Sequence, residues 1–345
     1  MIILGIESTC DETGTAIVKD GRQVLANVVT SSVELHKKYA GVVPEVAARE
    51  QIRSIIPVLT EALSKDFEID AIAVAYGPGL VGSLLIGVET AKTLALVWDK
   101  PLIPINHLMG HVYANWLSVD SSQFTENNHQ PSTVNREPTF PLIALIVSGG
   151  HTDLLLMTNH GKYKWLGGTL DDAAGEAFDK VARVLGLEYP GGPQIERLVR
   201  KFKVQSSKLR FPRPMKDSDN FDFSFSGLKT AVVNLVHSSQ FTVHSREEIA
   251  FEFQKAIVEV LTTKTLRAAK KFDAKSIVVG GGVAANSEFK RQMSDIGKQN
   301  KINIFFPPKD LAIDNGAMIA AAAFFIKKTV NPLKLSADPG LYFIS

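Results

Sequence analysis

The sequence predicts an α/β protein with two lobes, mixed sheets and a cleft between the lobes. Strand-like and helix-like segments alternate through most of the chain. Residues 1–29 follow the order strand, polar turn, strand, turn, strand, and residues 142–166 repeat that order. A hairpin opens each half, whereas the later strands are separated by helices. Antiparallel and parallel pairs are therefore expected in each sheet.

The first half contains five strand patterns and three helix patterns. Short apolar runs bounded by turn residues predict strands, and apolar residues three or four positions apart predict helices. Asp20-Gly21 is typical of a hairpin turn between the second and third strands. The strands are expected at Ile2–Ile6, Thr15–Val18, Val24–Val29, Ala71–Ala75 and Leu102–Ile105, and the helices at Glu45–Leu63, Ser83–Val97 and His107–Leu117.

The second half is read in the same way. A glycine- and proline-rich break at Tyr189–Pro193 separates two of its helices, and Phe211–Phe225 is expected to be a loop. The strands are expected at Leu142–Val147, Asp153–Met157, Tyr163–Leu166, Ser276–Val279 and Ile302–Phe306, and the helices at Ala173–Leu185, Gln194–Phe202, Gly227–Val236, Glu247–Lys271, from Ala285 onward and at Asn315–Lys328.

The domain organisation follows from these patterns. Residues 118–141 are rich in Ser, Asn, Gln, Thr and Pro and predict a linker or surface insertion. Residues 1–117 are the expected first lobe and residues 142–345 the expected second lobe. The last helix is a candidate to return to the first lobe.

Composition excludes several protein classes. The 345 residues include 45% hydrophobic and 21% charged residues, which is ordinary for a folded protein. The single cysteine, Cys10, rules out an intrachain disulfide and fits a reducing compartment. The longest apolar run, Ala317–Ile326, is shorter than the about 20 residues of a membrane span. We therefore expect a cytoplasmic protein with no membrane partner, and the net charge of +2 requires any nucleic-acid surface to be local.

Three turns follow predicted strands and are rich in glycine or small residues: residues 7–14, 148–150 and 280–282. Such turns let backbone N–H groups approach a phosphate closely. None has the spacing of a Walker A loop or of a Rossmann fingerprint. Each alone is typical of an ordinary turn, whereas three at strand ends in two lobes favour a nucleotide cleft.

His107 and His111 lie four positions apart on a predicted helix, so they share one face. Two imidazoles at this spacing can hold one metal ion, although ordinary surface or cleft histidines are the alternative. Leu108 occupies the position that a zinc protease fills with its general base. Asp314, before the last helix, is a candidate third ligand, and its alternative role is the helix N-cap.

Two charged segments each allow a structural and a functional interpretation. The acidic stretch Asp171, Asp172, Glu176 and Asp179 is either a solvated helix face or a site for ribose or amide donors. Between residues 200 and 216, basic residues crowd beside Phe202 and Phe211 and suit either RNA or a solvated loop. These basic residues are Arg200, Lys201, Lys203, Lys208, Arg210, Arg213 and Lys216.

Ten motifs then occur in order from one end of the chain to the other. They are Ile6–Gly14, Gly41–Glu45, Gly77–Leu80, His107–His111, Val147–Thr152, Asp171–Lys180, Tyr189–Pro193, Phe223–Thr230, Gly281–Asn286 and Asp314–Ala317. Together they resemble the bacterial type of the tRNA N6-adenosine threonylcarbamoyltransferase family, from Met1 to about Lys328.

The resemblance implies an actin/Hsp70/sugar-kinase-like fold with ribonuclease H-like mixed sheets and a nucleotide cleft between the lobes. It implies an acyltransferase that moves a threonylcarbamoyl group from threonylcarbamoyl-adenylate to N6 of the adenosine 3′ of the anticodon. The substrates would be tRNAs that read codons starting with A, and AMP would be released. The implied partners are tRNA, a paralogous non-catalytic subunit and a small ATPase of the same pathway.

The resemblance also assigns roles to residues of this chain. His107, His111 and Asp314 would hold one divalent ion, with iron(II) favoured and zinc as the alternative. Asp11 and Glu12 would lie near the reacting centre. Because they are two carboxylates on the first loop between strands, we expect one of them to accept the proton of the amine. The adenylate would be bound by Ile146, Val147, Ser148, Gly149, Gly150, Asp179, Gly192, Glu196 and Asn286.

The chain departs from the family pattern in places. Met109 stands where bacterial relatives often carry Glu, Gln51 where they often carry His, and Ala40 where Gly is usual. Residues 118–141 are longer than usual. None of these departures falls on an implied metal ligand.

Three other functions remain open from the residues alone. A small-molecule kinase of the same fold would need a carboxylate base in the cleft. A metallopeptidase would need a Glu beside the histidine pair, where Leu108 stands. A non-catalytic scaffold subunit would not need His107, His111 and Asp314.

Overall fold

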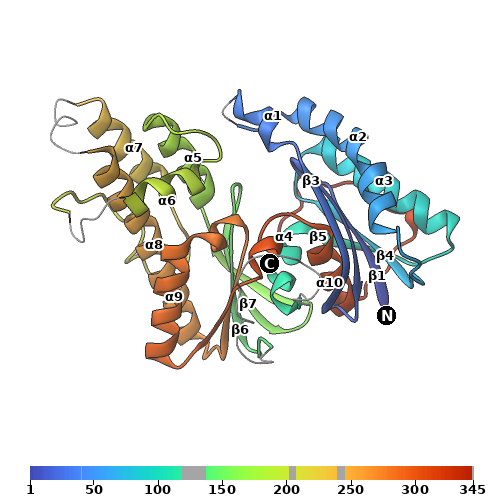
Figure 1. Cartoon of the computed structure of the whole chain (residues 1–345). Coiled ribbons are helices and arrows are strands. Elements are labelled where there is room, and N and C mark those ends of the chain that lie inside the picture. Colours follow the sequence, from blue (N-terminus) through green and yellow to red (C-terminus); the bar gives the residue numbers. More distant parts are fainter. Residues whose placement is uncertain (40, 119–136, 202–206, 239–244, 344–345) are drawn as a thin grey trace. The chain divides into compact units, whose positions relative to one another are not determined.

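The computed structural model describes residues 1–345 except 40, 119–136, 202–206, 239–244 and 344–345. The chain forms two compact units (Figure 1). Unit 1 contains the described parts of Met1–Leu35, Val42–Pro138 and Pro307–Ile344, and unit 2 those of His36–Gly41 and Thr139–Phe306. Most of the expected insertion at 118–141, together with Ala40, Phe202 and Lys203, lies outside the described residues.

Unit 1 is built on a five-stranded mixed sheet. Its strands are β1 (Ile2–Glu7), β2 (Glu12–Lys19), β3 (Gln23–Ser31), β4 (Ala71–Gly77) and β5 (Leu102–Asn106), in the order β3-β2-β1-β4-β5. β1 pairs antiparallel with β2 and parallel with β4, so it is the central strand. Five of its six residues are buried, as expected for a strand covered on both faces.

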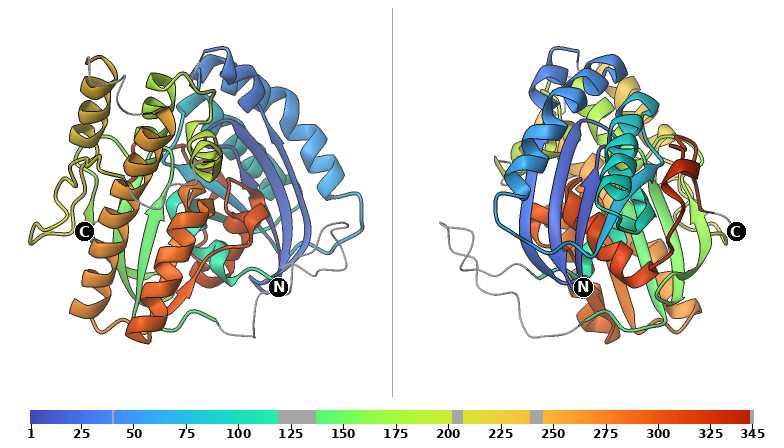
Figure 2. Two further views of the ribbon diagram at one scale, coloured as in Figure 1. Left: turned by 60° about the vertical axis from the view of Figure 1, so that its left-hand side comes forward. Right: turned by 90° about the vertical axis from the view of Figure 1, so that its right-hand side faces the viewer.

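Helices cover this sheet on both faces. α2 (Pro44–Ala62) and α3 (Val81–Val97) pack on each other and on the sheet, and they run side by side in blue and cyan in Figure 2. α4 (His107–Tyr113) and the alanine-rich α10 (Gly316–Ile326) pack on each other, and α10 lies along β1 (Figure 1). The C-terminal segment therefore belongs to the unit that the N-terminal strands build.

Unit 2 is built on a second five-stranded mixed sheet. Its strands are β6 (Leu142–Val147), β7 (Thr152–Asn159), β8 (Lys162–Gly168), β9 (Ser276–Gly280) and β10 (Asn303–Phe305), in the order β10-β9-β6-β7-β8. Its helices are α5 (Ala174–Val184), α6 (Gly191–Lys201), α7 (Ser226–Val236), α8 (Arg246–Lys271) and α9 (Ser287–Asn300). Apolar residues of β6, β7 and β9 share one core with those of α5, α7 and α8.

The two sheets have the same topology. In each, the first strand is central, two antiparallel strands follow on one side, and two parallel strands lie on the other. The repeat seen as a sequence pattern is therefore a repeat of strand order and direction. The expected mixed sheets are confirmed.

The structure differs from the sequence-based expectations in a few elements. The short helix α1 (Val33–Lys37) was not expected, because five residues are too few to show a helical period. α6 begins at Gly191, inside the expected break, since Pro193 falls in its first turn, where proline is tolerated. Among the helices described, none is both long and apolar enough to cross a membrane.

Candidate functional site

The two histidines of the predicted pair lie at the start of α4. The Asn106 side chain caps this helix by accepting a hydrogen bond from the Leu108 N–H at 2.8 Å, so the helix starts where β5 ends. His107 and His111 are both buried on one face, with ring centroids 4.7 Å apart. The residue beside His107 is the buried, apolar Leu108, so no carboxylate stands at this position of the helix.

Asp314 reaches the histidines because α10 packs directly on the central strand. A Cβ atom on Gly5 of β1 would lie 2.1 Å from the Gly316 carbonyl oxygen, so only glycine permits this approach. Asn315 is the N-cap of α10, since its Oδ1 accepts from the Met318 N–H at 3.0 Å. The capping role considered for Asp314 thus falls to its neighbour.

A second close approach brings α4 to α10. Gly110 lies between the two histidines, and a Cβ atom there would meet the Ile319 Cδ1 atom at 2.9 Å and the Met318 Cγ atom at 3.1 Å. A larger residue at this position would require the Ile319 and Met318 side chains to shift. Gly110 therefore favours close packing of α4 on α10.

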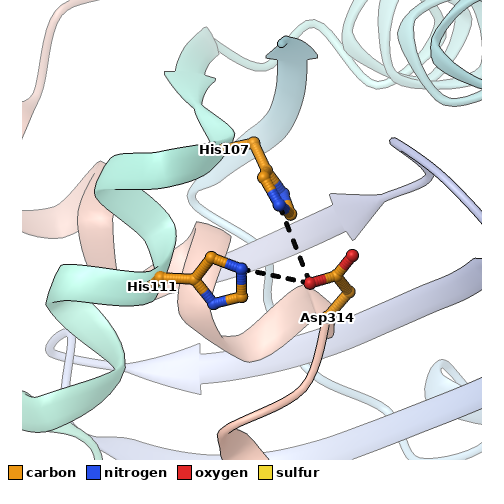
Figure 3. Close-up of side chains that lie close together, drawn as sticks. All are labelled: His107, His111 and Asp314. Carbon is orange, nitrogen blue, oxygen red and sulfur yellow. Dashed lines mark ion pairs between the residues drawn. The ribbon is translucent and has the colours of Figure 1, made fainter. Parts of the chain in front are cut away.

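His107, His111 and Asp314 form a group that can hold a metal ion (Figure 3). The Asp314 Oδ1 atom lies 3.2 Å from His111 Nε2 and 3.7 Å from His107 Nε2, and one ligand atom from each residue lies within 4.8 Å of the others. Among the described residues, neither ring nitrogen of the buried His111 makes a hydrogen bond, and the Asp314 carboxylate is the group that Nε2 faces. A buried imidazole without hydrogen bonds is costly, so two histidines and a carboxylate in this arrangement fit a metal ion.

His107 is held from the opposite side of its ring. Its Nδ1 lies 3.0 Å from Glu7 Oε2 and 3.3 Å from Thr9 Oγ1. Burial alone would lower the pKa of His107, but the charges of Glu7 and Asp314 outweigh it and raise this pKa to about 9. The sequence interpretation placed Glu7 in a polar turn. The signal it missed is that Glu7 directly follows the apolar run of β1, so the strand can continue through it.

Asp11 and Glu12 lie at the turn between β1 and β2. The Glu12 carboxylate accepts from Ser31 Oγ at 3.1 Å. Burial, followed by the charges of Asp314 and Asp11, raises the pKa of Glu12 well above its usual range. Burial and the Asp11 charge also raise the pKa of the Cys10 thiol, so this cysteine is not an activated nucleophile.

The Gln51 side chain of α2 fixes the turn between β1 and β2 through hydrogen bonds. Its Nε2 donates to the carbonyl oxygens of Cys10 at 3.1 Å and Glu12 at 2.6 Å, and its Oε1 accepts from Thr13 Oγ1 at 2.7 Å. A neutral histidine has one donor and one acceptor, so it could not make all three bonds. The departure at Gln51 therefore has a structural role in this chain.

In unit 2, the predicted adenylate residues begin at the end of β6. Ile146 and Val147 are fully buried within the sheet, where Ile146 pairs with Asp153 of β7 and Gly280 of β9. In the turn that follows, a Cβ atom on Gly149 or Gly150 would meet nothing within 4 Å. The turn therefore leaves open space beside its backbone.

Two more of these residues tie neighbouring elements of unit 2 together. Asp179 Oδ1 accepts from the Gly191 N–H at 2.7 Å, which fixes the start of α6 against α5. A Cβ atom on Gly192 would meet nothing within 4 Å, so open space adjoins this helix end too. Glu196 Oε1 accepts from Ser287 Oγ and its N–H, which joins α6 to the start of α9.

Asn286 caps α9. Its Oδ1 accepts from the Phe289 N–H at 3.0 Å, and its Nδ2 donates to Gln254 Oε1 at 3.0 Å. A pocket of about 750 Å³ adjoins these residues and is lined in part by Glu196, Gln254 and Ser287. Gln254 and Ser287 were not singled out from the sequence, because nothing local marks them.

The remaining charged candidates make structural contacts. Asp171 accepts from Ser224 Oγ at 2.5 Å and from the Phe225 N–H at 2.8 Å, and Asp172 pairs with Lys180 and Lys229, each at 2.6 Å. Neither Asp171 nor Asp172 therefore belongs to a purely solvated helix face.

In the basic segment, Arg210 pairs with Glu252 at 2.7 Å, and Arg213 with Glu259 at 2.8 Å. Acids of α8 thus compensate part of its charge.

Comparison with known proteins decides the family. A family model described as tRNA N6-adenosine threonylcarbamoyltransferase matches residues 23–321. The chain is 48% identical to the protein of that name from Thermomicrobium roseum, over 94% of this chain and 92% of that protein. The chain belongs to the tRNA N6-adenosine threonylcarbamoyltransferase family. It is also 46% identical to the Moorella thermoacetica member, over 98% of this chain and 96% of that protein.

Solved structures support the fold class of this family member. Full-length HypF, in a phosphate- and nucleotide-bound form, matches with a TM-score of 0.59 and 13% identity, over 97% of this chain and 56% of that chain. Component A of the (R)-2-hydroxyglutaryl-CoA dehydratase of Acidaminococcus fermentans matches with a TM-score of 0.52 and 15% identity, over 94% and 98%. The expected actin/Hsp70/sugar-kinase-like fold is thus confirmed.

Proposed function

We propose that this chain transfers the threonylcarbamoyl group from threonylcarbamoyl-adenylate to N6 of the adenosine 3′ of the anticodon. The products are AMP and the modified adenosine, in tRNAs that read codons starting with A. The observation that carries the proposal is the group of His107, His111 and Asp314 in a chain that belongs to this family.

Unit 1 supplies the proposed metal centre. The three side chains would hold one divalent ion and leave coordination positions open. Two histidines and one carboxylate are the ligand set typical of non-haem iron(II), so iron(II) is proposed over zinc. When bound, the ion would polarise a donor oxygen and offset phosphate charge as a Lewis acid.

Unit 2 supplies the proposed adenylate-binding residues. The segment at residues 146–150 would bind the phosphate through the backbone N–H groups of Gly149 and Gly150, since these open glycines leave room for it. Asp179, Glu196 and Asn286, with the Gly192 backbone, would bind the nucleoside through its hydroxyl and amino groups. Their contacts between α5, α6 and α9 support this role, because they hold the side chains in place before a ligand arrives.

Asp11 and Glu12 would serve the acceptor side of the reaction. The amine at N6 is a weak nucleophile and must lose a proton as the new bond to the acyl carbon forms. Positioning supplies much of the rate in such a reaction, and one of these carboxylates would accept the proton.

The variants Asp11→Asn and Glu12→Gln, assayed for transfer with donor and tRNA supplied, show which of the two carboxylates is needed. Unchanged transfer by a variant would remove that residue from the role.

The proposed partners are tRNA, a paralogous non-catalytic subunit and a small ATPase. For tRNA, the basic segment at residues 200–216 offers the exposed Lys201 and Lys208 beside the acid-paired arginines.

For the paralogous subunit we propose the α2–α3 apolar face, which consists of Ile52, Ile56, Val81 and Leu85. These side chains are 44–60% exposed, and each pair lies one turn apart on its helix. Exposed apolar clusters of this kind mark protein interfaces.

The direct test is to incubate the full chain with threonylcarbamoyl-adenylate and unmodified tRNA, and to analyse the nucleosides by mass spectrometry. The expected result is threonylcarbamoyl-adenosine formed in step with AMP. Absence of the modified nucleoside, with the partner proteins also present, would overturn the proposed function.

A further inference from the structure

Glu7 is a buried carboxylate that the proposed reaction does not use. Its side chain is fully inaccessible at the end of the central strand β1. A buried carboxylate is tolerated only when its oxygens are hydrogen-bonded. Glu7 Oε1 accepts from the Thr9 N–H at 2.7 Å, and Glu7 Oε2 lies 3.0 Å from His107 Nδ1.

The surroundings of Glu7 leave it little freedom. β1 is paired on both sides, and Glu7 itself faces Gly14 of β2. The Thr9 carbonyl oxygen accepts from the Leu80 N–H at 2.8 Å, and a Cβ atom on Gly79 would lie 2.6 Å from that oxygen. The Gly77-Pro78-Gly79 turn thus packs closely against Thr9, whose N–H donates to the Glu7 carboxylate.

We propose that Glu7 is a positioning residue of the metal centre, which fixes the tautomer and the direction of the His107 ring. A carboxylate only accepts, so the nitrogen that faces it must carry the proton. With hydrogen on Nδ1, the lone pair of Nε2 faces Asp314, 3.7 Å away. Metal-bound histidines commonly donate their other N–H to a carboxylate in this way, which raises their basicity as ligands.

The two histidines differ in this respect. In the part of the chain that the structure describes, His111 Nδ1 makes no hydrogen bond, so no carboxylate holds this ring from the side opposite Asp314 as Glu7 holds His107. The inference rests on the proposed metal centre and assigns the oriented ligand to His107 alone. Glu7→Gln changes the donor pattern and little else, because the amide Nε2 can donate to Nδ1. Hydrogen would then move to Nε2, which could no longer bind metal.

The experiment measures Zn²⁺ affinity of the full-length chain by competition with a chelator, so transfer activity is not needed. Glu7→Gln is expected to weaken Zn²⁺ binding by about 10–100-fold. The matched control is Glu252→Gln, which alters another fully buried carboxylate, in unit 2, that pairs with Arg210 and Arg213. The control should retain the wild-type dissociation constant.

Nitrogen-15 NMR of the zinc-loaded wild type gives a second readout, which does not depend on a variant that folds. The inference expects hydrogen on Nδ1 and zinc on Nε2 of His107. Zinc on Nδ1, or wild-type affinity in a folded Glu7→Gln variant, would overturn the role of Glu7 alone. A wild-type chain that binds no Zn²⁺ would overturn the metal centre, and the Glu7 role with it.

Discussion

At the residue scale, His107 is the proposed metal ligand whose protonation would oppose metal binding. Its pKa of about 9 means that the metal-free chain carries a proton on this ring at neutral pH. The raised pKa also means that the Glu7 and Asp314 charges stabilise the folded metal-free chain below the unfolded pKa of about 6.5, and that this stabilisation is lost as pH rises through about 9.

Metal affinity should therefore rise with pH. A metal ion must displace the His107 proton, so the apparent affinity should increase about tenfold per pH unit between pH 6.5 and 8.5. Calorimetry in buffers of different ionisation enthalpy measures the protons released. About one proton per ion is expected at pH 7.5, and binding that is independent of pH over this range would contradict the assignment.

At the element scale, α5 and α7 are joined through Asp172, which contacts Lys180 on the first helix and Lys229 on the second. Burial raises the pKa of Asp172, but hydrogen bonds from the two lysines outweigh it and lower this pKa overall. The two ion pairs of Asp172 therefore stabilise the fold at pH values above the unfolded pKa of about 3.9. This stabilisation is lost as the pH falls through the lower pKa that Asp172 has in the folded chain.

Asp172→Asn is expected to lower the free energy of unfolding by about 2 kcal/mol at pH 7, because Lys229 loses the Asp172 carboxylate and Lys180 keeps only its pair with Glu176. Urea unfolding at pH 7 and at low pH measures this. The difference in the free energy of unfolding between variant and wild type should become smaller at low pH, where Asp172 is protonated. If this difference is the same at both pH values, the ion pairs are not its cause.

The α2–α3 apolar face gives another prediction at this scale. Ile56→Asp and Val81→Asp should each weaken binding of the paralogous subunit at least tenfold, since a carboxylate would have to be buried in the interface. The matched control is Leu333→Asp, at a residue 73% exposed in η5 (Pro332–Lys334). Surface plasmon resonance measures the affinities. Wild-type binding by both face variants would place the partner elsewhere.

At the scale of the whole molecule, short-range patterns predicted the strands and most helices, because each is marked by its own apolar spacing. The order of strands within each sheet depends on pairings between distant segments, such as β1 with β4, and no local pattern encodes them. α1 and the start of α6 were missed for local reasons: α1 is too short to show a helical period, and the glycines and proline at the start of α6 are typical of a break.

The residues of the candidate site likewise include some that local sequence patterns predict and others that depend on contacts between distant segments. His107 and His111 could be read from their helical spacing. The approach of Asp314 to them depends on the contact between Gly5 and Gly316, which joins the two ends of the chain. Glu7 was missed for a similar reason, since its partner His107 lies 100 positions further on. The site is thus a product of the fold of unit 1 rather than of any one motif.

The measurement that tests the account most directly is transfer by the chain after its metal has been removed and then restored. With metal removed by a chelator, the formation of threonylcarbamoyl-adenosine on unmodified tRNA should fall to background. One equivalent of iron(II) should restore it in the wild type but not in a His107→Ala, His111→Ala variant. Undiminished transfer by a chain with no detectable metal would contradict the central claim.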